Sequence, residues 1–213
     1  MERLAATGHR AIAPDLPGRG GEATQTLDAY ARRIGEVVAA EAEPVLLVGH
    51  SMGGVVITTV AERMPERVKR LVYVCAFLPA SGQSLLDLAR TDTESTLMRY
   101  LVIDEAAGLH HVRPEGARES FYHDCPVADA EAAAARLGKE PLSVVATPVV
   151  TTAARFGRVP RTYVECTEDR ALGPALQRRI LAAQPCDVTR LASSHSPFYS
   201  QPDALAGILR EVA

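Results

Sequence analysis

Short strand-like runs, most of them continuously apolar, alternate along this chain with longer stretches of helical spacing. The runs cover residues 11–14, 45–48, 70–77, 161–166 and 187–191. Continuous apolar runs of this length are typical of parallel strands that are covered on both faces. Their alternation with helices predicts an α/β fold with a doubly wound, mostly parallel sheet.

Helical spacing fills the segments between the runs. Apolar residues recur every three or four positions from Leu27 to Val38, and Thr26 directly before them is a good N-cap. The same spacing predicts helices over residues 52–64, 174–184 and 203–212. Each of these helices begins or ends close to a proline, as helix boundaries often do.

Residues 78–155 break this alternation. Helical pieces at 85–89, 94–101 and 128–137 are separated by glycine and proline, and strand patterns between them are weak. A structureless loop of this length would be unusual in a compact domain. The pattern therefore predicts a core formed by residues 1–77 and 156–213, with residues 78–155 inserted as a helical cap.

Composition narrows the function classes. The 213 residues are 47% hydrophobic and 23% charged, which excludes general disorder. With 23 Lys and Arg against 26 Asp and Glu, the net charge of −3 disfavours nucleic acid as a partner. The apolar runs are too short to span a bilayer and the first residues lack a signal-peptide pattern, so we expect a cytoplasmic protein without a membrane partner. The four cysteines lack metal-site spacing, so reduced thiols are expected.

The strongest chemical signal is G-x-S-x-G between a predicted strand and a predicted helix. Here it reads Gly49-His50-Ser51-Met52-Gly53. This motif forms a sharp turn that presents the serine hydroxyl as a nucleophile. We expect glycines at both ends because a Cβ atom at Gly49 or Gly53 would collide with neighbouring backbone. The glycine patterns of dinucleotide-binding and phosphate-binding loops are absent from this segment.

A serine nucleophile needs a base and an acid that orients it. In strand–turn–helix sites of this kind the acid and then the histidine follow the serine along the chain. His195 follows the last predicted strand, and Asp169 follows the strand before it. We expect His195 to be the base and Asp169 the acid, with Glu168 the main rival and Asp187 a more distant one.

The other histidines are weaker candidates. His9 precedes the first predicted strand and would lie at the wrong end of the sheet, whereas His50 is expected beside the turn. Three histidines and an aspartate in the inserted segment suggest a metal site at first sight, but they lack the i, i+4 spacing of helical ligands. The histidines are His110, His111 and His123, and the aspartate is Asp124. A solvated or pocket-lining position is favoured for these histidines.

The chain resembles the α/β-hydrolases, and within them the group of plant methyl esterases, hydroxynitrile lyases and their bacterial esterase relatives. The matching stretches are residues 8–18, 49–54, 163–169 and 194–198. The resemblance implies that the nucleophile is Ser51, the acid Asp169 and the base His195. It also implies that the backbone N–H of Met52 is one donor of the oxyanion hole.

Two features depart from that group. Its lyases carry a lysine after the catalytic histidine and commonly a glutamate before the serine, where this chain has Ser196 and His50. Hydrolysis is therefore favoured over lyase chemistry. The family also begins with a strand and a His-Gly loop that precede the segment matching residues 1–14. We therefore expect a core that lacks its first strand and oxyanion loop, and a natural start upstream of Met1.

Together these observations predict a serine hydrolase that cleaves a small carboxylic ester without metal or cofactor. The expected contacts of the substrate are His50, Phe77, Leu78, Phe121 and Tyr122. A ligand-binding homologue without turnover, and a lyase or cyclase that uses the same pocket, are the alternatives. The sequence leaves a homodimer open.

Overall fold

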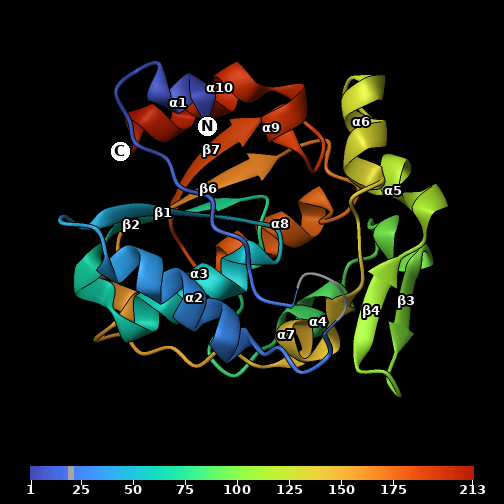
Figure 1. Ribbon diagram of the computed structural model, residues 1–213, viewed down its shortest axis with the longest axis horizontal. Coiled ribbons are helices and arrows are strands. Elements are labelled where there is room, and N and C mark those ends of the chain that lie inside the picture. Colours follow the sequence, from blue (N-terminus) through green and yellow to red (C-terminus); the bar gives the residue numbers. More distant parts are fainter. Residues whose placement is uncertain (19–21) are drawn as a thin grey trace.

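A four-stranded parallel sheet forms the centre of the computed structural model, which describes residues 1–18 and 22–213. The sheet has the order β1-β2-β6-β7 (Figure 1). All of its strands fall on predicted runs, namely β1 (Val45–His50), β2 (Val68–Val74), β6 (Arg161–Cys166) and β7 (Asp187–Leu191). The predicted α/β fold with a parallel sheet is confirmed.

Helices cover both faces of this sheet, because successive residues of a strand point to opposite sides. On β2, Leu71 and Tyr73 pack in one core cluster and Val72 and Val74 in another. The first cluster includes residues of α2 (Leu27–Ala39), α3 (Gly53–Arg63) and α8 (Pro174–Ala183). The second includes residues of α1 (Glu2–Ala5) and α10 (Pro202–Glu211), which lie together above the sheet in Figure 1.

The predicted helix boundaries hold where capping signals support them. The Thr26 hydroxyl accepts a hydrogen bond of 3.1 Å from the backbone N–H of Ala29, as an N-cap does. Pro174 and Pro202 are the first residues of their helices, where the missing N–H costs nothing.

Residues 11–14 are not a strand, so that prediction was wrong. Ile12 is 47% exposed, and the segment runs beside the core without joining a described sheet. Among the described residues β1 pairs only with β2, so residues 11–14 have no strand to pair with. The expectation that the core lacks the family's first strand and oxyanion loop stays a prediction.

The inserted segment contains a small antiparallel sheet as well as helices, so the prediction of a purely helical cap was wrong. β3 (Leu101–Asp104), β4 (Leu109–Val112) and β5 (Glu140–Pro141) pair in this order, beside α5 (Pro114–Phe121) and α6 (Val127–Ala134) (Figure 1). The helix expected over residues 94–101 is a 3-10 turn, η2 (Leu97–Arg99), followed by β3. Strands of two to four residues are too short to show a periodicity of their own, so the sequence did not predict them. Gly108 lies in the turn between β3 and β4 with a φ of 66°, a conformation that glycine adopts readily.

The remaining short helices lie in the core and in the inserted segment. They are α4 (Leu85–Ala89), α7 (Leu142–Ala146), α9 (Pro197–Ser200), η1 (Pro65–Arg67) and η3 (Phe156–Arg158). No helix within the described ranges is both long and apolar enough to cross a lipid bilayer.

The turn between β1 and α3 places Ser51 at its tip with a φ of 52°, a left-handed conformation that non-glycine residues rarely adopt. Close backbone approaches hold this turn. A Cβ atom at Gly49 would lie 2.7 Å from the Gly53 carbonyl oxygen, and one at Gly54 would lie 2.1 Å from that of Phe77. A Cβ atom at Gly53 would meet nothing within 4 Å, so the predicted collision there was wrong. The crowded glycine of this helix is Gly54, which faces the segment after β2.

We expect Gly54→Ala to destabilise the protein by about 3 kcal/mol, because helix α3 or the segment after β2 must move to admit the methyl group. Gly53→Ala is the matched control, and it should change the free energy of unfolding by no more than about 1 kcal/mol. Urea denaturation of both variants measures the difference. Equal stability of the two variants would show that the approach of Gly54 to Phe77 is not a constraint.

Candidate active site

A buried acid–base pair lies beyond the carboxyl ends of β6 and β7. Asp169 Oδ2 lies 2.7 Å from His195 Nδ1, and the two residues are 3% and 2% exposed. Asp169 Oδ1 accepts hydrogen bonds from the backbone N–H groups of Ala171 and Leu172 at 2.7 and 2.9 Å. Since the carboxylate occupies Nδ1, the neutral imidazole of His195 carries its proton there and keeps Nε2 as the acceptor.

The structure separates Asp169 from its two rivals. Glu168 is exposed, and its backbone N–H donates to the carbonyl of Ser193 at 3.1 Å. Asp187 lies at the opposite end of β7 and pairs with Arg70 at 2.7 Å. Among the three candidate acids, only Asp169 contacts the imidazole of His195.

Ser51 and Met52 line a cavity between the sheet and the cap. The cavity has a volume of about 660 Å³. Within the described chain, the Ser51 hydroxyl makes no hydrogen bond, and neither does the backbone N–H of Met52. An unpaired backbone N–H next to Ser51 has the position that an oxyanion donor takes beside a serine nucleophile.

Mostly apolar side chains form the cavity walls. Of the predicted substrate contacts, Phe77 and Phe121 line this cavity, whereas Leu78, Tyr122 and His50 are not among its lining residues. Leu78 is fully buried in the main core, and Tyr122 packs in a cluster with Cys125 and two alanines of α6. A contact of these three residues with substrate stays a prediction. In the pairs Phe77–Leu78 and Phe121–Tyr122, only the first residue lines the cavity. The apolar wall includes residues that the sequence did not single out, among them Leu86, Met98, Leu101, Val112, Leu142 and Val145.

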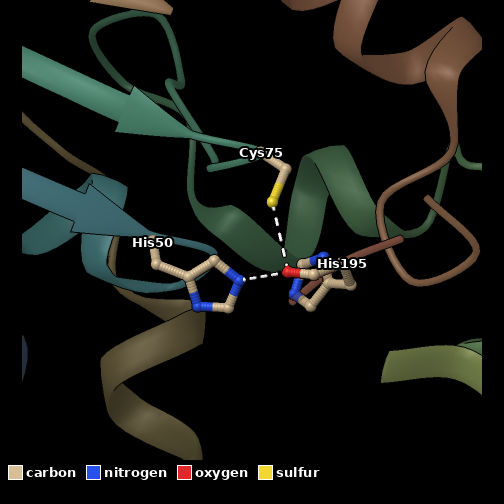
Figure 2. Close-up of side chains that lie close together, drawn as sticks. All are labelled: His50, Cys75 and His195. Atoms are coloured by element: carbon tan, nitrogen blue, oxygen red, sulfur yellow. Dashed lines mark hydrogen bonds between the residues drawn. The ribbon is translucent and has the colours of Figure 1, made fainter. Parts of the chain in front are cut away.

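His50 supports the loop of His195 rather than the cavity wall. Its Nε2 lies 2.6 Å from the backbone carbonyl oxygen of His195, and the Cys75 thiol donates to the same oxygen at 3.3 Å (Figure 2). Because a carbonyl only accepts, His50 must carry its proton on Nε2. Burial, with His195 close by, lowers the pKa of His50 to about 3, so the imidazole stays neutral and can donate.

This cluster has the residue types of a metal site, since ligand atoms of His50, Cys75 and His195 all lie within 4.8 Å of one another. Two of the side chains already donate to the His195 carbonyl. Burial, together with the neighbouring Cys166, raises the pKa of the Cys75 thiol well above its usual range, which disfavours the thiolate that a metal requires. The arrangement therefore fits an anchor for the His195 loop better than a metal centre. Nothing in the spacing of Cys75 along the chain indicated this contact.

The three histidines of the cap have different surroundings. His110 and His111 line the cavity, whereas His123 Nε2 donates to the backbone carbonyl of Glu168 at 2.9 Å. The Nε2 atom of His110 is buried and has no hydrogen-bond partner among the described residues. Burial, followed by the nearby His111, lowers the pKa of His110 and keeps its ring neutral.

The free energy of unfolding should fall in acid because of His50. The pKa of His50 is about 3 in the folded protein and near 6.5 when exposed, so only the unfolded chain gains this proton as the pH falls below 6.5. The stabilisation is complete above pH 6.5 and is lost as the pH falls toward 3. Between pH 7 and pH 5 the wild type should lose about 2 kcal/mol more than His50→Gln, as measured by urea denaturation. His9→Gln, at an exposed position, should behave like the wild type, and an identical loss in His50→Gln would contradict a depressed pKa.

Replacing His110 by leucine should raise the free energy of unfolding by about 1 kcal/mol, because an unpaired buried nitrogen costs stability and leucine has none. His111→Leu, at the adjacent wall position, is the control and should have a smaller effect. Both are measured by urea denaturation at pH 7. A loss of stability in His110→Leu would indicate that the nitrogen is paired in solution.

Comparisons with known proteins agree with this geometry. Residues 1–208 match the model of the alpha/beta hydrolase family. The chain is 31% identical to pyrethroid hydrolase from Sphingobium wenxiniae over 224 residues, covering 99% of this chain and 80% of that protein. It is 29% identical to putative methylesterase 14 from Arabidopsis thaliana over 229 residues, and the match covers 99% of this chain and 66% of the relative.

Solved structures of this family superpose closely. The crystal structure of a pyrethroid hydrolase from Sphingobium faniae matches 98% of this chain and 87% of its own, with a TM-score of 0.84 and 26% identity. The parallel sheet, the covering helices and the strand–turn–helix around Ser51 are therefore those of an established fold. The chain belongs to the α/β-hydrolase family.

Proposed function

We propose that this protein is a serine hydrolase that cleaves a carboxylic ester through an acyl-enzyme, with Ser51 as nucleophile, His195 as base and Asp169 as the acid that orients it. The observation that carries the proposal is the buried contact of 2.7 Å between Asp169 and His195, next to the turn that presents Ser51. The names of relatives, a pyrethroid hydrolase and a methylesterase, support ester hydrolysis.

The reaction proceeds in two halves. His195 Nε2 takes the proton of the Ser51 hydroxyl as its oxygen attacks the ester carbonyl, and the Met52 N–H donates to the negative oxygen that forms. Collapse of this intermediate breaks the ester bond, and the leaving alkoxide receives the proton from His195. A water molecule, deprotonated by the same imidazole, then attacks the acyl carbon. The bond to the Ser51 oxygen breaks as the imidazolium returns its proton to that oxygen, and the acid is released.

Asp169 acts by orientation and charge. Its carboxylate fixes the proton of His195 on Nδ1 and stabilises the imidazolium that forms in each half-reaction. Within the described residues no hydrogen bond joins the Ser51 hydroxyl to His195, so the proposal requires this contact to tighten in the substrate complex, as catalytic hydrogen bonds commonly do.

The cavity favours neutral, largely apolar esters. Its volume of about 660 Å³ and its apolar walls accommodate an acyl or alcohol group well beyond acetate in size. Ser196, which follows His195, offers no cation for the leaving group of a lyase reaction, so hydrolysis is favoured over the lyase alternative.

Ser51→Ala should lower the turnover of p-nitrophenyl butyrate by about 10⁴-fold, because the variant lacks the oxygen that forms the acyl-enzyme. Ser81→Ala, at an exposed serine of the cap, is the control and should retain full activity. A fluorophosphonate probe should label the wild type and Ser81→Ala but not Ser51→Ala.

Three outcomes would contradict the proposal. Equal hydrolysis by wild type and Ser51→Ala would exclude Ser51 as nucleophile. A ligand-induced thermal shift without probe labelling would favour a binding protein. Activity that survives Ser51→Ala but is lost in His195→Ala would favour a lyase-type use of the base.

A further inference from the structure

Two adjacent residues of the cap each contact the residue that directly precedes a member of the acid–base pair. His123 Nε2 donates to the carbonyl of Glu168 at 2.9 Å, and Glu168 is followed by Asp169. Asp124 Oδ2 accepts from the backbone N–H of Ser194 at 2.7 Å, and Ser194 is followed by His195. A single short segment after α5 therefore holds both loops of the pair.

Further contacts join the same segment to the loop of His195. The Ser194 hydroxyl donates to the carbonyl of Phe121 at 3.4 Å, and the Cys125 thiol donates to the carbonyl of Ser196 at 3.9 Å. Cys125 is buried, and Phe121 and Asp124 are half-buried. The loop of His195 is thus fixed from the cap side as well as from His50 and Cys75.

Asp124 makes its contact as a carboxylate. Burial opposes the charged form, but the polar groups around the carboxylate, foremost the hydroxyl and backbone N–H of Ser194 and then the Ser200 hydroxyl, outweigh burial and lower the pKa of Asp124 below its usual range. A hydrogen bond to an ionised acceptor is about twice as strong as one between neutral groups. The Ser194 N–H is therefore held more firmly than an ordinary loop amide.

The segment also meets the substrate cavity. The Phe121 side chain lines the cavity, and its ring centroid lies 5.4 Å from that of His195. His123 and Asp124 follow two and three residues later. The cavity wall and the contacts to the two loops are therefore built from one continuous piece of chain.

We propose that His123 and Asp124 are positioning residues, which set the placement of His195 relative to Asp169 and Ser51 from the cap. The inference rests on the proposed function, since it assigns a role within that reaction. Neither residue touches the reacting atoms; each acts through the backbone of a neighbour. A misplacement of about 1 Å between catalytic groups can lower a rate by about 100-fold, so contacts of this kind affect turnover more than binding.

The decisive variant is Asp124→Ala, with Asp129→Ala as its matched control. Asp129 is an exposed aspartate of the same cap, on α6, and forms no hydrogen bond within the described chain. With p-nitrophenyl butyrate, Asp124→Ala should lower kcat by about 10- to 100-fold while KM changes less than about threefold. Asp124→Asn, which keeps an acceptor oxygen, should recover part of kcat, and His123→Leu should lower kcat in the same direction.

A second measurement is independent of turnover. The proton between His195 Nδ1 and Asp169 gives a downfield resonance in NMR spectra, and it can be recorded in Ser51→Ala protein. This resonance should shift or broaden in Asp124→Ala and stay unchanged in Asp129→Ala. If the wild type proves inactive but the resonance responds in this way, the proposed function fails and the positioning role stands.

The inference is overturned if Asp124→Ala and His123→Leu leave both kcat and the resonance unchanged. It is equally overturned if the variants alter KM alone, since that would place these residues in substrate binding. If Asp124→Ala does not fold, Asp124→Asn and His123→Leu decide the question by the same two measurements.

Discussion

A carboxylate removed from water must be matched by hydrogen-bond donors, and that requirement at Asp169 governs the arrangement of the loops above the sheet. Its two oxygens receive the imidazole N–H of His195 and the backbone N–H groups of Ala171 and Leu172. Leaving such a group unpaired would cost several kcal/mol. The loops after β6 and β7 are therefore tied to each other through this one side chain, and the position of the His195 imidazole follows from it.

The turn between β1 and α3 and the loop of His195 are connected by a second set of contacts. His50 precedes Ser51, and together with Cys75 at the end of β2 it donates to the backbone carbonyl of His195. The ends of three strands of the sheet, β1, β2 and β7, thereby contribute to the placement of one imidazole. Parallel strands bring their carboxyl ends to the same edge of a sheet, which is why residues so distant in sequence can meet there.

The sequence predicted those parts of the molecule whose patterns are long or chemically distinctive. β6 and β7 were predicted with their observed bounds, and Thr26 caps α2 as expected. The short strands β3 and β4 were missed because four residues are too few to distinguish a strand from a broken helix. Residues 11–14 have the composition of a strand but no described strand beside them, and pairing is a property of the fold rather than of the segment.

The candidate site was predictable in its residue types but not in its orientations. Glu168 and Asp169 are adjacent acids, and only the fold shows which carboxylate turns toward His195. The same holds for Phe77 and Leu78, of which one faces the cavity and the other the core. The supporting contacts of Cys75, His123 and Asp124 join segments distant in sequence, so no local pattern could indicate them.

The contact between the Cys75 thiol and the His195 carbonyl bears on how this protein tolerates oxidants and alkylating agents. Cys75 is fully buried, and its raised pKa keeps it as an unreactive thiol although it lies beside the proposed base. Cys125 and Cys166 are buried as well, and Cys186, at the far end of the sheet from His195, is the only partly exposed cysteine of the four. Electrophiles that modify a cysteine of the native protein thus meet Cys186, at the opposite end of the sheet from His195 and Asp169.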